Sequence, residues 1–316
     1  MRGLRQFLFR WQNLLGILIV GVFVAMAVSA PHLTASDNAE SPQWIRAVER
    51  IEGTSRRVPL PPGPGIPLGT TAGGYDIFYS LLWGARSALG FGLAVASITA
   101  MLGTFIGAMS AYFGGLAHRL TLRVIDAFLT FPPIAAVWLL AQVMRPPEVL
   151  PPGISLQAVL AQLRVSPVML ALILFSWMPY ARIIGAEVLG LKHSEYVEAA
   201  RSLGAGHFRL IFRHLLPNAI SPAIVLLARD IGGMVILQAA FHFIGLGGMS
   251  PWSWLLVNGR NWILGPNASL LTYWWVYLPA TLALVIFGIG WNLLGDGLNE
   301  ALNPRFYNGP MRWGRA

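Results

Sequence analysis

The sequence predicts an all-α membrane protein with about six transmembrane helices, and two observations support that prediction. Hydrophobic residues make up 55% of the 316-residue chain and charged residues only 11%, whereas a soluble domain carries about 25% charged residues. Several stretches without charge also reach the roughly 20 residues that a helix needs to cross a bilayer. These two features together exclude an ordinary soluble domain.

Six stretches along the chain are candidate spans. In order they are Trp11–Ala30, Ala88–Tyr112, Val124–Met144, Val165–Ala181, Ala219–Gly245 and Trp275–Gly295. Prolines in the third and fourth stretches are tolerated, because neighbouring helices can satisfy the backbone groups that a proline leaves free. The first stretch follows several arginines and could also be a signal peptide. Its apolar run is longer than the 7–15 residues typical of such a peptide, which favours a membrane anchor.

The basic residues predict the orientation of these spans. With a cytoplasmic N-terminus, the segments on the inside hold Arg2, Arg5, Arg10, Arg119, Arg123, Arg182, Lys192, Arg201, Arg209, Arg213, Arg305, Arg312 and Arg315. Short outside segments hold only Arg145, Arg164 and Arg260. The other outside arginines lie in one long loop, which translocates with little regard to charge. Both termini of this multi-pass membrane protein are therefore expected in the cytoplasm.

The spans divide the chain into four parts. We expect an N-terminus and first helix at 1–30, an extracytoplasmic loop at 31–80, a five-helix core at 81–300 and a cytoplasmic tail at 301–316. Prolines between Pro59 and Pro67 predict an extended linker within the loop. The Trp-rich segment Met249–Trp274 is expected to rest at the outer membrane interface.

The cytoplasmic connection at 186–218 is the most informative segment. It predicts two short amphipathic helices, one with Tyr196, Val197, Ala200 and Leu203 on one face. The second repeats apolar residues at the helical spacing, at Phe208, Ile211, Phe212 and Leu215. Gly204 stands where a helix needs a left-handed residue to end, and Pro217 is expected to close the second helix. Periodicity alone is equally compatible with a helix that lies on lipid headgroups.

The residues of this segment resemble the EAA coupling loop of ABC importer permeases. The likeness rests on Glu198-Ala199-Ala200, Gly204 and Leu216-Pro217, and the His-x-Leu-Pro form at His214–Pro217 is similar to the peptide-importer subgroup. Further segments resemble the same family in the same order, including Tyr112–Gly115, Phe243–Gly247 and Asp296–Arg305. The resemblance covers roughly residues 1 to 308. It is closest to the second permease of dipeptide/oligopeptide-type importers.

The resemblance implies a function and partners. The chain would form half of a translocation path for peptides or a similar small solute, together with a second permease, which is expected to be a paralogue. Cytoplasmic ABC ATPase subunits and an extracytoplasmic substrate-binding protein would complete the system. Coupling to the ATPase would use the 195–217 loop, with Glu198 as a polar contact, Gly204 as the turn and Phe208 or Phe212 as an apolar plug.

Charged and polar residues in the fifth span are candidates for the translocation path. A charge at mid-membrane costs roughly 2.5–3.5 kcal/mol, so Arg229 and Asp230 should face protein or a water-filled path. Gln238 and His242 join this set, since they replace an acidic and a small residue of the family pattern. A tie between helices is the alternative role for the charged pair. Asp126, in the third span, is expected to pair with Arg123 or Arg119 rather than to relay protons.

Several other functions find no support in the sequence. The absence of cysteine excludes disulfides and Cys-ligated metal sites, and the histidines show no metalloprotease spacing. Lys192 is the only lysine and lacks a P-loop around it, so the chain does not hydrolyse ATP itself. Neither a cofactor, a metal nor a nucleic-acid partner is expected, because the basic residues are scattered between apolar stretches. A passive channel or ion-coupled carrier that works without an ATPase is the remaining alternative.

Overall fold

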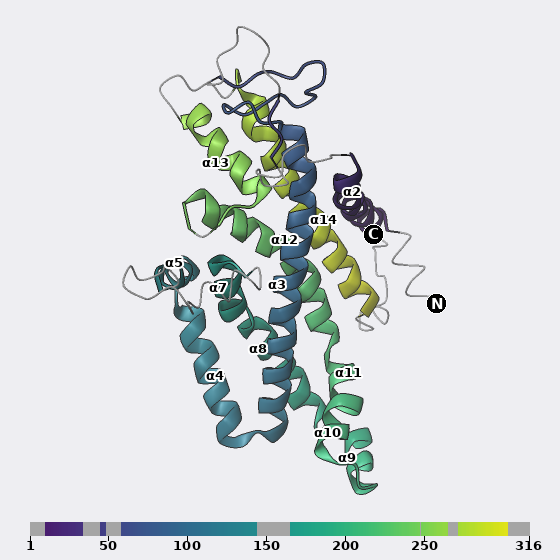
Figure 1. The fold of residues 1–316 in the computed structure, drawn as a ribbon. Helices are drawn as coiled ribbons and strands as arrows, with labels where there is room; N and C mark the ends of the chain where they lie inside the picture. The colour runs from purple at the N-terminus through teal and green to yellow at the C-terminus, as the bar shows by residue number, and fades with distance from the viewer. Residues whose placement is uncertain are drawn as a thin grey trace, which may run out of the picture.

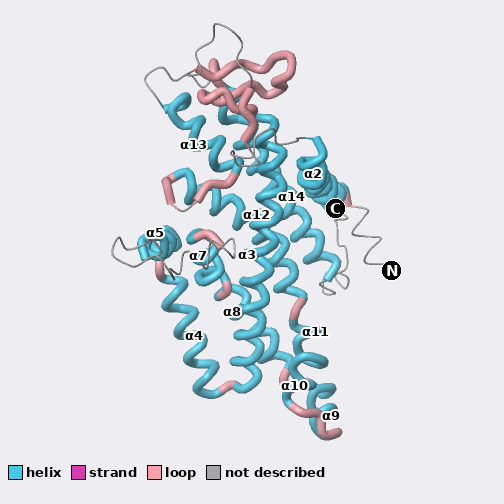
Figure 2. The backbone as a smooth tube through the Cα atoms, in the orientation of Figure 1, coloured by secondary structure: helices cyan, strands magenta, loops and turns pink. Residues whose placement is uncertain are grey.

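A computed structural model describes residues 10–33, 45–48, 58–143, 165–246, 248–264 and 271–302. Its regular elements are helices, and the described β-bridges are isolated pairs (Figures 1 and 2). The helices are α2 (Trp11–Leu33), α3 (Ile77–Phe113), α4 (Gly115–Thr130), α5 (Pro133–Val143), α7 (Pro167–Ser176), α8 (Met178–Leu191), α9 (Glu195–Ser202), α10 (His207–Arg209), the π-helix η1 (Leu210–Leu215), α11 (Leu216–Ala219), α12 (Ser221–Phe243), α13 (Pro251–Leu264) and α14 (Trp274–Leu302).

The predicted fold class and the approximate number of spans are confirmed. Within the described residues, 5 helical segments are long and apolar enough to cross a membrane, and a bent pair of helices brings the number to 6. Three spans extend well beyond their expected ends: α3 begins at Ile77 rather than Ala88, α7 and α8 together continue to Leu191, and α14 continues to Leu302. The break between α7 and α8 lies at Trp177, just before Pro179.

The third span is not the straight helix that was expected over Val124–Met144. It bends by 93° between α4 and α5. Pro132 and Pro133 explain the bend, because neither donates an N–H and a proline disfavours helical geometry in the preceding residue. Phe131 indeed has extended geometry, with φ −81° and ψ 127°. Met144 lies outside the described residues.

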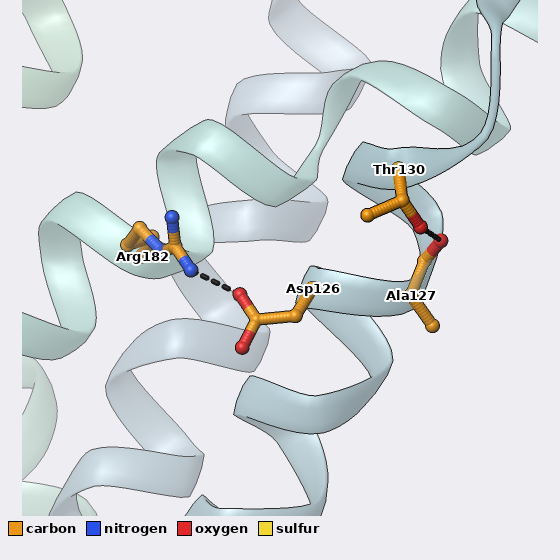
Figure 3. Close-up of polar contacts among 4 residues, drawn as sticks. All are labelled: Asp126, Ala127, Thr130 and Arg182. Carbon is orange, nitrogen blue, oxygen red and sulfur yellow. Dashed lines mark hydrogen bonds and ion pairs between the residues drawn. The ribbon is translucent and has the colours of Figure 1, made fainter.

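The expected partner of Asp126 is also corrected. Its carboxylate pairs with Arg182 of α8 rather than with Arg123 or Arg119 of its own helix (Figure 3). Thr130 donates to the carbonyl of Ala127, 2.7 Å away, at the end of the same helix. The sequence spacing identified nearby arginines on α4, whereas the fold brings α8 alongside α4 and supplies a partner from there.

Helix α3 runs through the middle of the molecule, with α9 and α10 at one end and α13 at the other (Figure 1). At 37 residues it is about 55 Å long, well beyond the roughly 30 Å hydrocarbon core. Glycines let its neighbours approach closely. A Cβ at Gly107 would lie 2.4 Å from the Ala181 carbonyl oxygen on α8, and one at Gly92 would lie 2.7 Å from the Ile231 carbonyl oxygen on α12.

The first helix, α2, packs into the bundle. Gly290 of α14 makes room for it, since a Cβ there would lie 2.5 Å from the Ile19 side chain. The Phe23 ring contacts the rings of Trp252 and Phe287, with centroids 5.7 Å and 5.2 Å apart. Phe23 of α2 therefore forms part of the buried core.

One expectation about the end of the molecule that carries α13 is wrong. The segment with Pro59–Pro67 is compact rather than extended: Leu60 and Thr70 exchange hydrogen bonds of 2.9 Å and 3.1 Å across a turn region. Glycines between the prolines permit these turns. In the Trp-rich segment Met249–Trp274, Trp252 packs inside the protein, whereas Trp274 is exposed. Trp252 is 2% exposed, and its indole N–H donates to the Leu81 carbonyl at 2.9 Å.

Candidate functional site

The connection between α8 and α12 forms a helical hairpin, defined here as residues 195–219, at the extremity of the molecule (Figure 1). Its first arm, α9, ends at a turn with Gly204 at φ +81°. The Gly204 N–H donates to the Arg201 carbonyl and the Ala205 N–H donates to the Ala200 carbonyl, each at 3.0 Å. This pair of bonds is a Schellman motif, which satisfies the last carbonyls of the helix. The sequence prediction for Gly204 is confirmed.

The second arm is a continuous helix with a π-helical segment, and Pro217 does not close it. Pro217 stands instead in the first turn of α11, directly after η1. Because proline donates no N–H, the regular bonding pattern cannot continue through it. The Leu216 N–H donates to the Ile211 carbonyl five residues earlier. Such a π-helical turn is often found at functional sites.

Buried residues fix the hairpin to the membrane helices. Val197 of α9 and Leu210 and Leu215 of η1 pack with Ile184 and Val188 of α8 in one hydrophobic cluster. Ala108 and Ala111 of α3 belong to the same cluster, so the hairpin packs against two spans.

A polar contact ties the second arm to α3. The Tyr112 hydroxyl and His207 Nδ1 are 2.7 Å apart, and their rings meet edge to face with centroids 5.6 Å apart. Sequence reasoning missed this contact, because nothing in the two segments signals that they meet. A displacement of the hairpin would thus be transmitted to α3 as well as to α8.

The apolar face of each arm is divided between the core and solvent. Val197, Ile211 and Leu215 are buried, whereas Phe208 is 75% exposed and Leu203 is 89% exposed. The Phe208 and Phe212 rings lie with centroids 4.5 Å apart. The hairpin therefore buries part of each apolar face and leaves another part of its apolar surface uncovered. Of the eight predicted coupling residues, Glu198, Ala199, Gly204, Phe208, Phe212 and Pro217 are exposed, and Ala200 and Leu216 are partly buried.

Replacing Gly204 with alanine should loosen the hairpin turn. A left-handed conformation costs a non-glycine residue about 1–2 kcal/mol, which corresponds to roughly 5- to 30-fold faster opening. Hydrogen–deuterium exchange at the Ala205 amide, measured by mass spectrometry, should accelerate by that factor. Gly206→Ala is the matched control, since Gly206 has φ −69° and nothing lies within 4 Å of an added Cβ. Equal exchange in both variants would contradict the prediction.

The two charged residues of α12 have separate partners. Arg229 forms an ion pair with Asp296 of α14. The Asp230 carboxylate accepts a hydrogen bond of 2.7 Å from the hydroxyl of Tyr180 on α8. Adjacent residues point about 100° apart on a helix, which accounts for the two different neighbours.

Gln238 and His242 lie nearer the other end of α12. Both are buried, at 7% and 5% exposure. The His242 Nδ1 atom is 2.9 Å from the hydroxyl of Ser253, which also accepts from the Ser250 N–H at the start of α13. His242 thus helps to hold α13 against α12. In the described ranges, no three His, Asp or Glu side chains converge in a way that could hold a metal ion.

A cavity of about 490 Å³ lies between the second arm of the hairpin and the spans α3 and α12. Ala100 and Thr104 of α3, Phe212 of η1, and Ala223 and Leu227 of α12 are among its lining residues. Its walls are almost entirely apolar. Sequence reasoning missed the α3 side of this cavity, because small residues on a long apolar helix give no distinctive pattern.

Comparison with known proteins gives one consistent result. Residues 103–307 match the family described as binding-protein-dependent transport system inner membrane component. The chain is 28% identical to a dipeptide transport system permease protein of Alkalihalophilus pseudofirmus, over 92% of this chain and 85% of the relative. It is likewise 28% identical to an oligopeptide transport system permease protein of Bacillus subtilis, over 92% and 85%. A glutathione transport system permease protein of Pectobacterium atrosepticum is 32% identical over 75% of this chain and 72% of the relative.

Proposed function

The chain belongs to the family of inner membrane components of binding-protein-dependent transport systems, and we propose that its 195–217 segment docks the ATPase that drives transport. As a member of this family it is a multi-pass inner membrane protein and the permease subunit of an ABC importer, with ATP hydrolysis on a separate component. An ATPase and a binding protein are thus its general partners. The docking site, the second permease and the solute are the finer points of the proposal.

The observation that carries the docking proposal is the uncovered apolar surface of the hairpin. Leu203, Phe208 and Phe212 are exposed at the extremity of the chain, while the residues beneath them are anchored in the bundle. A protein groove of matching shape would bury these side chains and transmit a push through the hairpin. An arrangement of a few exposed apolar anchors on a rigid support is typical of a protein-binding surface.

The hairpin's position also suggests how docking could move the path. Val197 and Leu210 connect it to α8 and its second arm leads through α11 into α12. The cavity beside Phe212 lies between α3 and α12. A rigid displacement of the hairpin would therefore change the separation of the helices that line the cavity, as alternation between two states requires.

The proposed solute is a peptide or a similar small molecule. The relatives named above transport dipeptides, oligopeptides or glutathione, according to their names. The chain would supply half of the path, and a second permease, expected to be a paralogue, would supply the other half. Lipid would cover the remaining apolar surface of the spans. With the hairpin on the ATPase side, both termini would be cytoplasmic, as the distribution of basic residues favours.

Affinity purification from mild detergent tests the proposal. The wild-type chain should retain a protein with the ATP-binding signature Gly-x-x-x-x-Gly-Lys-Ser/Thr, identified by mass spectrometry, together with a second permease. A chain with both Glu198→Arg and Gly204→Pro should lose the ATPase but keep the second permease, because the membrane helices remain intact. The retained permease serves as the internal control for folding.

Other outcomes have definite meanings. An ATPase that stays bound to the double variant would place docking elsewhere on the chain. If the folded wild-type chain retained no ATPase and transported its solute without ATP, a passive channel or ion-coupled carrier would replace the proposal.

A further inference from the structure

Asp230 lies in the middle of a membrane-spanning helix and forms no ion pair with the residues that the structure describes. It is the tenth residue of the 23-residue helix α12. Its carboxylate accepts one hydrogen bond, from the neutral hydroxyl of Tyr180. Within the described parts of the chain, no Lys, Arg or His side chain forms an ion pair with it, whereas Asp126 and Asp296 each pair with an arginine. An ionisable residue at this depth is by default a functional-site hypothesis.

The position of Asp230 on α12 relates it to the cavity. Ala223 and Leu227 line the cavity, and Asp230 follows them by seven and three residues. Residues with this spacing lie on the same face of a helix. Asp230 therefore lies one turn beyond Leu227, on the same face of α12 that lines the cavity.

Tyr180 orients the carboxylate without neutralising it. The tyrosine is fully buried, so its hydroxyl is held in place by the packing of α8. A carboxylate offers about four acceptor sites, and one neutral donor occupies only one of them. Most of the acceptor capacity, and the negative charge of the ionised form, therefore remain for another group.

We propose that the Asp230 carboxylate attracts the cationic group of the transported solute and so favours solutes with a free ammonium. This inference rests on the proposed import of peptides or similar solutes, because it assigns a selective contact to the same path. A peptide carries an α-ammonium, which would form a charge-assisted hydrogen bond with the carboxylate. Blocking that amine by acetylation removes both the charge and donors.

The absence of cysteine from the natural chain allows a direct test of the charge. A Leu227→Cys variant, assembled in the complete transporter, would be labelled with methanethiosulfonate reagents that carry either a trimethylammonium or a sulfonate group. Labelling of this chain alone is followed by its mass. Adding Asp230→Asn should lower the ratio of cationic to anionic labelling rates about tenfold, as expected for loss of a unit charge one turn away in a partly solvated site.

Glu187→Gln is the matched control, because Glu187 is an exposed acidic residue of α8 that plays no part in the proposal. It should leave the ratio unchanged. No labelling of Leu227→Cys by either reagent, or a ratio insensitive to Asp230→Asn, would overturn the inference.

A second experiment tests the solute class. Proteoliposomes with the complete transporter and its binding protein would be given a mixture of lysine-free dipeptides, half of it N-acetylated with an isotopic label. The ratio of free to acetylated peptides accumulated inside the proteoliposomes should be severalfold lower for Asp230→Asn than for wild type. The binding protein's own preference affects both transporters equally, so it does not change this comparison. Uptake with an unchanged ratio would overturn the inference.

A wild-type transporter that takes up no peptide at all would contradict the proposed function. The labelling ratio would still decide whether Asp230 attracts cations.

Discussion

A valine at Gly107 should disrupt the packing of α3 against α8, and much less of the chain should accumulate in a folded form. A Cβ at this position would lie 2.4 Å from the carbonyl oxygen and 2.8 Å from the Cα of Ala181. Both are backbone atoms, so no side chain can rotate to make room. Association of membrane helices depends on close packing at small residues. Overpacking of this kind costs about 1–3 kcal/mol or more.

The effect can be measured by size-exclusion chromatography of the fluorescently tagged chain in mild detergent. Gly107→Val should reduce the monodisperse peak by more than half and lower the temperature at which the remainder aggregates. Gly90→Val on the same helix is the matched control, since Gly90 is exposed and nothing lies within 4 Å of an added Cβ. Because both variants place valine in the same helix, its helix propensity cancels. Equal peaks for the two variants would show that α3 and α8 do not meet at Gly107.

Hydropathy predicted the spans well because lipid leaves few alternatives to an apolar helix. The ends of the spans were less predictable. Helix α3, for example, already begins at Ile77, and its first turns include polar residues such as Arg86 and Ser87. The bend at Pro132 and Pro133 could have been expected from proline chemistry alone. The pairing of Asp126 with Arg182 could not, because it depends on which helices are neighbours in space.

The hairpin shows the same limit at a finer scale. Gly204 was predictable because a left-handed helix end has a strong residue preference, and its φ of +81° agrees. The division of the hairpin's apolar residues into buried and exposed ones was not predictable, because the sequence does not show which of them the spans will cover. Val197 and Phe208 are both apolar, yet one is buried and the other is 75% exposed. That difference makes the second residue useful as a probe of docking.

Replacing Phe208 with glutamate should abolish coupling while leaving the permease folded. Most of this ring faces solvent in the isolated chain, so its removal costs little in folding stability. If the ring inserts into a groove of the ATPase, the substitution replaces an apolar anchor with a charge in a buried interface. Loss of such an anchor typically costs 2 kcal/mol or more, which is at least about a 30-fold loss of affinity.

Binding of the purified ATPase to the permease in lipid nanodiscs would measure this loss, and ATP-driven uptake should fall with it. Leu271→Glu is the matched control, because Leu271 is 89% exposed in the connection between α13 and α14, away from the hairpin. The comparison also separates docking from the alternative in which the hairpin rests on lipid headgroups. In that alternative the ring would lie among acyl chains, and Phe208→Glu would leave ATPase affinity equal to that of Leu271→Glu. The hairpin is joined to α8 and α12 through buried contacts. An affinity loss confined to Phe208→Glu would therefore identify the exposed surface of the hairpin, rather than the spans, as the site that receives the motion of the ATPase.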